Sequence, residues 1–178
     1  MSELSSTYAG ALFDLSNEQG NTDIILSQCE TLRDILAENG DYIKLLDTPT
    51  VSKDEKIRTV DRIFRDSLDR NLLNYIKVMI ARGNSRELLA SLKDFEDLYN
   101  KANNIEKAVA VTAVPMTERA IERLTEKLEK MTGKKILLTN KVDEKCLGGV
   151  ILEFSTMQLD DSIASKLEEL RDRLRHAE

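Results

Sequence analysis

The adjacent glycines Gly148 and Gly149 are the residues of this chain that come nearest, in type and spacing, to a phosphate-binding loop. Such a loop needs glycines at fixed offsets, then a lysine and a hydroxyl residue, all at the start of a helix whose backbone amides hold the phosphate. Here no further glycine follows, and the pair leads into the apolar segment VILEF, residues 150–154. The pattern therefore favours a tight bend before a buried strand over a nucleotide site.

The remaining reactive side chains do not form the constellations that catalysis or metal binding requires. The single histidine, His176, is third from the end of the sequence, where we expect a helix to fray. Cys29 and Cys146 are far apart and flanked by apolar residues, which predicts buried, reduced thiols. The acidic doublets 143–144 and 160–161 fit turns or helix starts. We therefore expect no catalytic residue, no cofactor and no metal site.

Charge and composition narrow the class of partner. The 178 residues include 26 Lys and Arg against 32 Asp and Glu, for a net charge of -6. A phosphate backbone would be repelled by this balance, so we expect no nucleic-acid partner. No run approaches the roughly 20 apolar residues of a membrane span, so we expect no membrane-spanning helix.

Helical periodicity governs the chain as far as about residue 104. Apolar residues recur there at spacings of three and four, with helix-ending residues between the segments. Ser52 followed by Glu55 forms a capping box, the strongest local helix-start signal. Helices are predicted around Tyr8–Leu15, Ile25–Leu36, Tyr42–Leu46, from Ser52 to Phe64, Asn71–Arg82 and Leu88–Tyr99. We expect residues 1–104 to form a six-helix bundle.

From residue 105 the pattern changes to short strands and isolated helices. Three short apolar runs, 108–114, 135–139 and 149–154, predict strands, and a helix lies between the first two. A final helix is predicted to start near Asp160-Asp161-Ser162. Its apolar seam consists of Ile163, Leu167, Leu170 and Leu174. The fold class is thus mainly α with a small α+β part: a six-helix bundle followed by a small α+β domain over residues 105–178.

Two of the predicted helices carry more apolar surface than one side of a small bundle needs. The segment 72–80 is apolar over most of its circumference, and in the first helix Tyr8, Leu12 and Leu15 mark one face while Ala9 and Phe13 mark another. Such residues either belong to the core or line a groove that seats an amphipathic helix. Periodicity leaves both interpretations open.

Several stretches, in order along essentially the whole chain, resemble the delta subunit of F-type ATP synthase, the family of the mitochondrial oligomycin-sensitivity-conferring protein. They are YAGALFDLSNEQG at 8–20, TPTVSKDEK at 48–56, NLLNYIKVMIARG at 71–83, AVAVTAVPMT at 108–117, and GKKILLTNKVDEKCLGGVILEF at 133–154 with the following LDDSIASKL. Two places depart from the family pattern. Asn84 stands where an arginine is common, and Asp160-Asp161-Ser162 where Asp-Gly-Ser is common.

The resemblance implies a stator subunit without catalysis, which links the catalytic head of the synthase to its peripheral stalk so that rotary torque is resisted. The bundle would bind the amino-terminal helices of alpha subunits, and the domain 105–178 would bind the b subunits. The implied alpha contacts are Tyr8, Ala11, Leu12, Leu15, Asn74 and Val78. The implied b contacts are Ile163, Leu167, Leu170 and Leu174.

The same resemblance implies a peripheral location at the cytoplasmic face of a bacterial cell membrane, with the membrane reached only through the complex. Two alternatives are kept. One is a stand-alone helical adaptor with no role in ATP synthesis. The other, motivated by Gly148-Gly149 and the acidic doublets, is a small hydrolase or nucleotide-binding enzyme.

Overall fold

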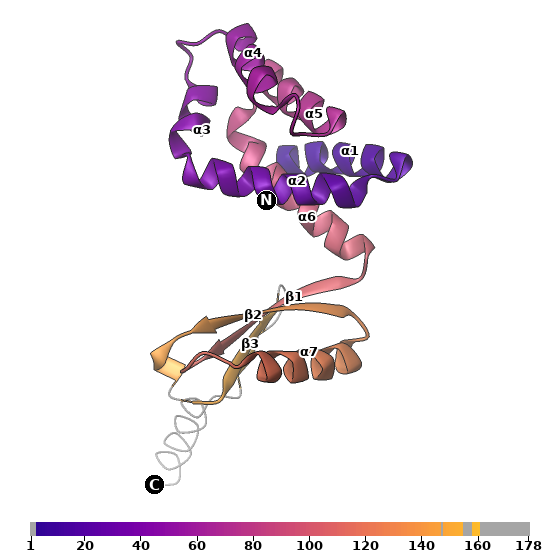
Figure 1. Cartoon of the computed structure of the whole chain (residues 1–178), viewed down its shortest axis with the longest axis vertical. Coiled ribbons are helices and arrows are strands. Elements are labelled where there is room, and N and C mark those ends of the chain that lie inside the picture. Colours follow the sequence, from indigo (N-terminus) through magenta and orange to yellow (C-terminus); the bar gives the residue numbers. More distant parts are fainter. Residues whose placement is uncertain (1–2, 147, 155–157, 161–178) are drawn as a thin grey trace. The chain divides into compact units, whose positions relative to one another are not determined.

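The computed structural model describes residues 3–146, 148–154 and 158–160. The chain divides into two compact units, Met1–Ala102 and Asn103–Glu178. The first unit contains six helices, coloured indigo to pink in Figure 1. They are α1 (Glu3–Gln19), α2 (Thr22–Glu38), α3 (Gly40–Asp47), α4 (Lys53–Phe64), α5 (Arg70–Arg82) and α6 (Leu88–Ala102), with the short 3-10 turn Ser85–Glu87 before α6. The predicted six-helix bundle is therefore confirmed.

Local signals in the sequence set the helix ends. At the start of α4 the Ser52 hydroxyl accepts a hydrogen bond from the Glu55 amide, while the Glu55 side chain accepts one from the Ser52 amide, so the predicted capping box forms. Gly83 ends α5 in the left-handed conformation with φ 78°. A side chain is strained at such a φ, which explains why glycine stops this helix.

Small residues line the inward side of α1, which packs mainly on α6. Its buried residues are Ser5, Ala9, Leu12 and Ser16. The small side chains of Ser5, Ala9 and Ser16 let two helix backbones approach closely. Ser5 donates a hydrogen bond of 2.6 Å to the Asp94 carboxylate of α6 inside the bundle. The expected apolar stripe through Leu15 does not point inward, because the small residues already form the contact with α6.

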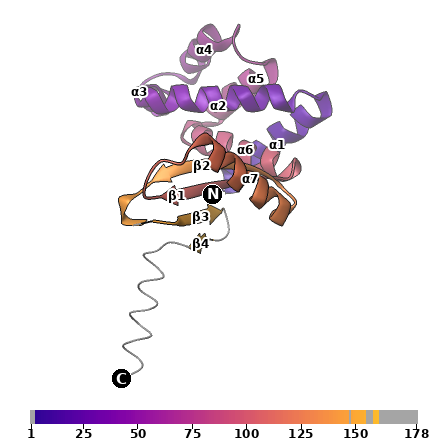
Figure 2. The same ribbon diagram turned by 60° about the horizontal axis from the view of Figure 1, so that its bottom comes forward.

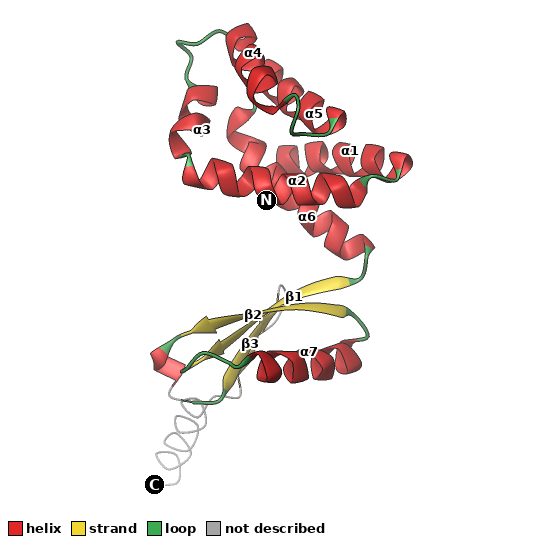
Figure 3. Ribbon diagram, in the orientation of Figure 1, coloured by secondary structure: helices red, strands yellow, loops and turns green. Residues whose placement is uncertain are grey.

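Over the residues of the second unit that the structure describes, 103–146, 148–154 and 158–160, one α-helix packs against a sheet (Figure 3). Its elements are β1 (Ile105–Thr112), α7 (Glu118–Thr132), β2 (Lys135–Val142), a 3-10 turn at Glu144–Cys146, β3 (Val150–Phe154) and β4 (Gln158–Asp160). The strand order is β2-β1-β3-β4. β1 and β2 run parallel and are joined by α7, whereas β3 is antiparallel to both β1 and β4. The expected small α+β part is present.

The glycine pair acts as a bend before a strand, as predicted. Gly148 and Gly149 have φ of 151° and 82°, and β3 begins at the next residue, Val150. These backbone angles are open to glycine and strained for other residues. No helix start follows the pair within 150–154, so the phosphate-loop interpretation is wrong for this segment.

The strand boundaries differ from the expected ones in three places. β1 begins at Ile105 instead of residue 108, and β2 continues to Val142. Asp160, expected near the start of the final helix, belongs to the strand β4, which was not predicted. The predicted final helix lies outside the described residues.

Candidate functional site

Two aromatic rings join α1 to α5 at the candidate partner-binding site. The rings of Tyr8 and Tyr75 meet edge to face, with centroids 6.4 Å apart and an interplanar angle of 78°. Such aromatic pairs stabilise by roughly 0.5 to 1.5 kcal/mol beyond the apolar area that they bury. The Tyr8 hydroxyl also accepts a hydrogen bond of 3.1 Å from the side-chain amide of Asn84. Tyr8 is thus fixed at its ring and at its hydroxyl.

Exposed side chains surround this aromatic pair on both helices. Ala11 and Leu15 of α1 and Asn74 and Val78 of α5 are exposed, and Val78 has 48% of its surface open to solvent. Tyr8 is half-buried. We call these five residues the α1/α5 face. Small or apolar side chains that remain exposed beside a fixed ring are suited to contact with another protein.

Leu12 is the exception among the expected contact residues. It is 2% exposed and packs in the bundle core. It cannot offer its side chain to a partner without a rearrangement of the helices, because α6 covers the inward stripe of α1 to which it belongs. Leu12 therefore supports the α1/α5 face from beneath.

Polar contacts hold the helices behind this face in register. At one end of α5 the side-chain amide of Asn71 donates to the Gln19 side chain of α1, 2.6 Å away. On the other flank Lys77 of α5 and Arg65 both pair with Asp61 of α4. The side-chain hydrogen bond from Lys77, with Arg65 beside it, holds the pKa of Asp61 below its usual value. The carboxylate stays charged and keeps both cations over the physiological range.

The Cys29 thiol and the Tyr75 hydroxyl in the bundle stay protonated at neutral pH. Burial raises the pKa of the Cys29 thiol to about 12, and the nearby Glu30 and Glu96 act in the same direction. Burial also raises the pKa of Tyr75, although the neighbouring Ser91 hydroxyl opposes this shift. A thiol that stays protonated is a poor nucleophile and a poor metal ligand. Both cysteines are free and buried, as predicted.

The described residues meet neither the requirements for a metal site nor those for a membrane span. Within residues 3–146, 148–154 and 158–160, no three His, Cys, Asp or Glu side chains lie close enough together to hold a metal ion. Over the same residues, no helix is both long and apolar enough to span a bilayer. His176 and the four expected b contacts, Ile163, Leu167, Leu170 and Leu174, lie outside the described residues.

Two parts of the site were not named as contacts from the sequence. Tyr75 reads as one apolar residue among several in segment 72–80, and its pairing with Tyr8 depends on how α1 and α5 pack. The sequence singled out Asn84 only because the family commonly has an arginine at this position. In the structure its amide is the group that holds the Tyr8 hydroxyl. A departure from a family pattern at a turn was thus the available signal.

The fold and the site together define a class: a six-helix bundle followed by an α+β unit, whose candidate site is a surface of packed side chains on two adjacent helices. The chain belongs to the ATP synthase delta (OSCP) subunit family, whose model matches residues 4–174. This family consists of structural, non-catalytic subunits of the peripheral stator of F-type ATP synthase. Membership favours the stator role over the stand-alone adaptor and the small enzyme.

Relatives and a solved structure agree with this assignment over nearly the whole chain. The chain is 32% identical to the ATP synthase subunit delta of Clostridioides difficile, with 96% of this chain and 95% of the relative covered. It is 30% identical to the subunit delta of Alkaliphilus oremlandii, with 98% and 97% covered. A chain in the cryo-EM structure of the Toxoplasma gondii mitochondrial ATP synthase hexamer has the same fold, with a TM-score of 0.76, 20% identity, and 97% and 98% covered.

Proposed function

We propose that this chain joins the catalytic head of the synthase to the peripheral stalk through two separate contacts. The α1/α5 face binds the amino-terminal helix of an alpha subunit. The unit from about residue 105 binds the b subunits, with Ile163, Leu167, Leu170 and Leu174 as the contact seam. The head is then held against the torque of the central stalk.

The observation that supports the first contact is the exposure of Leu15 and Val78 on either side of the fixed Tyr8 ring. Fully burying a leucine or valine side chain stabilises by roughly 1.5 to 3 kcal/mol. Because each of these is already partly covered, a docked helix gains about 1 kcal/mol from each. Fixing Tyr8 in advance lowers the entropy cost of binding, since its rotamer need not be ordered again.

The location follows from the same proposal. The protein lies at the cytoplasmic face of a bacterial cell membrane as a peripheral part of the complex, and it reaches the membrane only through its partner subunits. The acidic net charge of -6 is consistent with this arrangement, because anionic lipid surfaces repel it.

The first contact is tested by Val78→Asp. A carboxylate at this position must be desolvated when the partner helix docks, so the affinity for a peptide of the alpha subunit's amino-terminal helix should fall about tenfold or more. Isothermal titration calorimetry on the full chain measures the change. Val114→Asp is the matched control, because Val114 is exposed but belongs to the second unit.

Equal affinities of the Val78→Asp and Val114→Asp proteins for that peptide would contradict the proposed face. The second contact is tested in the same preparations with the soluble part of the b subunit and Leu167→Asp. This variant should lose binding of the b subunit and keep binding of the alpha peptide. The opposite pattern, or loss of both, would show that the two contacts are not separate.

A further inference from the structure

An apolar groove lies between α2, α3 and α4, away from the α1/α5 face. It has a volume of about 760 Å³. The residues that line it are Ile35, Glu38, Asn39, Gly40, Asp41, Tyr42, Leu45, Ile63 and Phe64. Its walls are thus contributed by the end of α2, by α3 and by the end of α4. We call it the α2/α3/α4 groove.

Three apolar side chains of this groove are exposed. Ile35 is 40% exposed, Leu45 41% and Ile63 51%. Each comes from a different helix, so the exposure is a property of the groove and not of a single frayed turn. Contiguous apolar patches of this kind, with polar residues at the edge, are typical of protein-binding surfaces.

The groove is long enough for a short helix. A second hollow shares Ile35, Ile63 and Phe64 with it and continues along α2 back to Gln28. From Gln28 to Glu38, at 1.5 Å per residue, the two hollows extend for about 15 Å, the length of a helix of about ten residues. This shape is too elongated for a compact small molecule and suits three turns of a helix.

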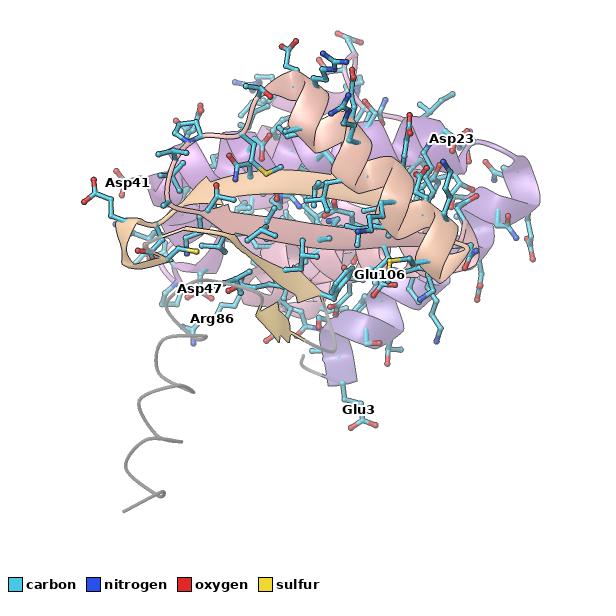
Figure 4. The ribbon with its side chains drawn as sticks, turned by 90° about the horizontal axis from the view of Figure 1, so that it is seen from below. Glu3, Asp23, Asp41, Asp47, Arg86 and Glu106 are labelled. Carbon is cyan, nitrogen blue, oxygen red and sulfur yellow. The ribbon has the colours of Figure 1, made fainter. Side chains whose placement is uncertain are left out.

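Charge at the groove is of one sign. Among the residues that line the two hollows, Glu38 and Asp41 are charged, and both are acidic. The Asp41 side chain projects into solvent (Figure 4), and its partner Lys44, 2.8 Å away, is equally exposed. Lys44 offsets the charge of Asp41, and Glu38 leaves the edge of the groove net acidic. An occupant with basic residues is favoured.

One buried polar group at the groove lacks a partner. The Tyr42 hydroxyl is enclosed and forms no hydrogen bond with any described residue. Its ring is edge-on to Phe64, with centroids 6.3 Å apart. Burial raises the pKa of Tyr42, so the hydroxyl remains a neutral donor. Buried hydroxyls are normally hydrogen-bonded, so this one is an unpaired polar group in the wall of the groove.

We propose that the α2/α3/α4 groove docks an amphipathic helix of another subunit, with Lys or Arg residues flanking its apolar face. This site goes beyond the proposed function, because it uses a surface separate from the α1/α5 face. A second copy of this chain is disfavoured, since two acidic grooves on chains of charge -6 repel each other. An anionic lipid surface is disfavoured for the same reason.

Methyl NMR on the full chain tests the proposal with two model peptides of about 18 residues, five helical turns each. One carries leucines on one face and lysines beside them; the other has glutamates in place of the lysines. The Leu/Lys peptide should shift the methyl signals of Ile35, Leu45 and Ile63, and the Leu/Glu peptide should not. Equal shifts with both peptides, or none with either, would overturn the proposal. Shifts that grow with protein concentration alone would assign the groove to a second copy.

Variants of the groove distinguish the contribution of its apolar lining to peptide binding from that of its acidic edge. Ile63→Glu should weaken binding of the Leu/Lys peptide at least tenfold, whereas Ile24→Glu, on an exposed part of α2 outside the groove, should leave it unchanged. The double change Glu38→Lys with Asp41→Lys should reverse the preference toward the Leu/Glu peptide. An unchanged preference in that protein would overturn the role of the acidic edge.

The same variants distinguish this proposal from the first. Binding of the isolated catalytic head should fall with Val78→Asp through the α1/α5 face, whatever happens at the groove. If Val78→Asp weakens head binding but Ile63→Glu leaves both the head and the Leu/Lys peptide bound as before, the proposed function stands and the groove proposal fails. If Ile63→Glu weakens binding of the head and of the Leu/Lys peptide while Val78→Asp leaves head binding unchanged, the groove proposal stands and the proposed function of the α1/α5 face fails.

Discussion

In the bundle, Phe95 is fully enclosed and the ring of Phe13 lies edge-on to it at 5.9 Å, whereas in the α+β unit the cluster of buried side chains consists of Ala108, Leu128 and Ile136. The bundle core draws on all six helices. In the described part of the second unit, the backbone ladder of the sheet and one face of α7 provide the packing. Figure 2 shows α7 beside the strands. A partner that attaches to the bundle therefore meets a surface with a broad core beneath it.

The contacts that link separate elements differ in the same way. In the bundle, side chains distant in sequence are joined through buried or half-buried groups, such as Ser5 with Asp94 and Arg33 with Glu96 at 2.6 Å each. In the second unit, the side-chain amide of Asn140 donates to the Ala110 carbonyl and the Thr112 hydroxyl across the parallel strands. In the bundle, these hydrogen bonds and ion pairs between side chains fix how the helices pack. In the sheet, the side-chain hydrogen bonds of Asn140 reinforce a strand register that the backbone hydrogen bonds already set.

The largest expected effect concerns the bundle core. Phe95→Ala should lower the free energy of unfolding of the bundle by about 3 to 5 kcal/mol, because it removes a ring from a fully enclosed site and leaves a cavity. Denaturant unfolding followed by far-ultraviolet circular dichroism measures the change. Leu15→Ala, on the exposed face of α1, should change it by less than about 0.5 kcal/mol. A small effect of Phe95→Ala would contradict a broad, rigid core.

The next effect concerns the narrower core. Leu128→Ala should lower the stability of the α+β unit by about 2 kcal/mol, the lower end for such changes, because the partly buried neighbours of this small cluster can fill part of the gap. Hydrogen exchange resolved by peptide should accelerate in β1, α7 and β2 and remain unchanged in the bundle. Faster exchange throughout both units would show that they unfold together, and the comparison would then fail.

The smallest effect at neutral pH concerns Cys29. Its pKa is 9.0 when exposed and about 12 in the folded chain, so the unfolded state loses its proton first as the pH rises. The contribution of the protonated Cys29 thiol to the free energy of unfolding is complete below pH 9. It declines as the pH rises from about 9 toward 12. Cys29→Ala should make the stability curve flatter in this window. At pH 8 the native thiol should resist alkylation, and rapid labelling of Cys29 would contradict its burial.

Much of the fold could be predicted because the signals are local. Ser52 and Glu55 cap α4 through contacts within one turn, and Gly83 stops α5 through its own backbone angle. β4 was missed because Gln158–Asp160 is short and only its middle residue is apolar, so its pairing with β3 decides its structure. Non-local pairing of this kind leaves no periodic pattern in the sequence.

The candidate site was less predictable than the fold. Leu12 and Leu15 belong to one apolar stripe in the sequence, yet the first is buried and the second exposed. The inward direction of α1 is set by Ser5 and Ser16, which a search for large apolar residues passes over. The α2/α3/α4 groove was missed because Ile35 and Ile63 fit the apolar pattern of their own helices, and periodicity does not show that the space between those helices is open.

The small inward stripe of α1 has a consequence for how this protein can evolve. Ser5, Ala9 and Ser16 mediate the packing on α6, while Ala11 and Leu15 look outward and take no part in it. Substitutions at the outward positions can follow changes in a partner's sequence without disturbing the interior. Lineages can therefore diverge in which partner they recognise while the scaffold beneath is inherited unchanged.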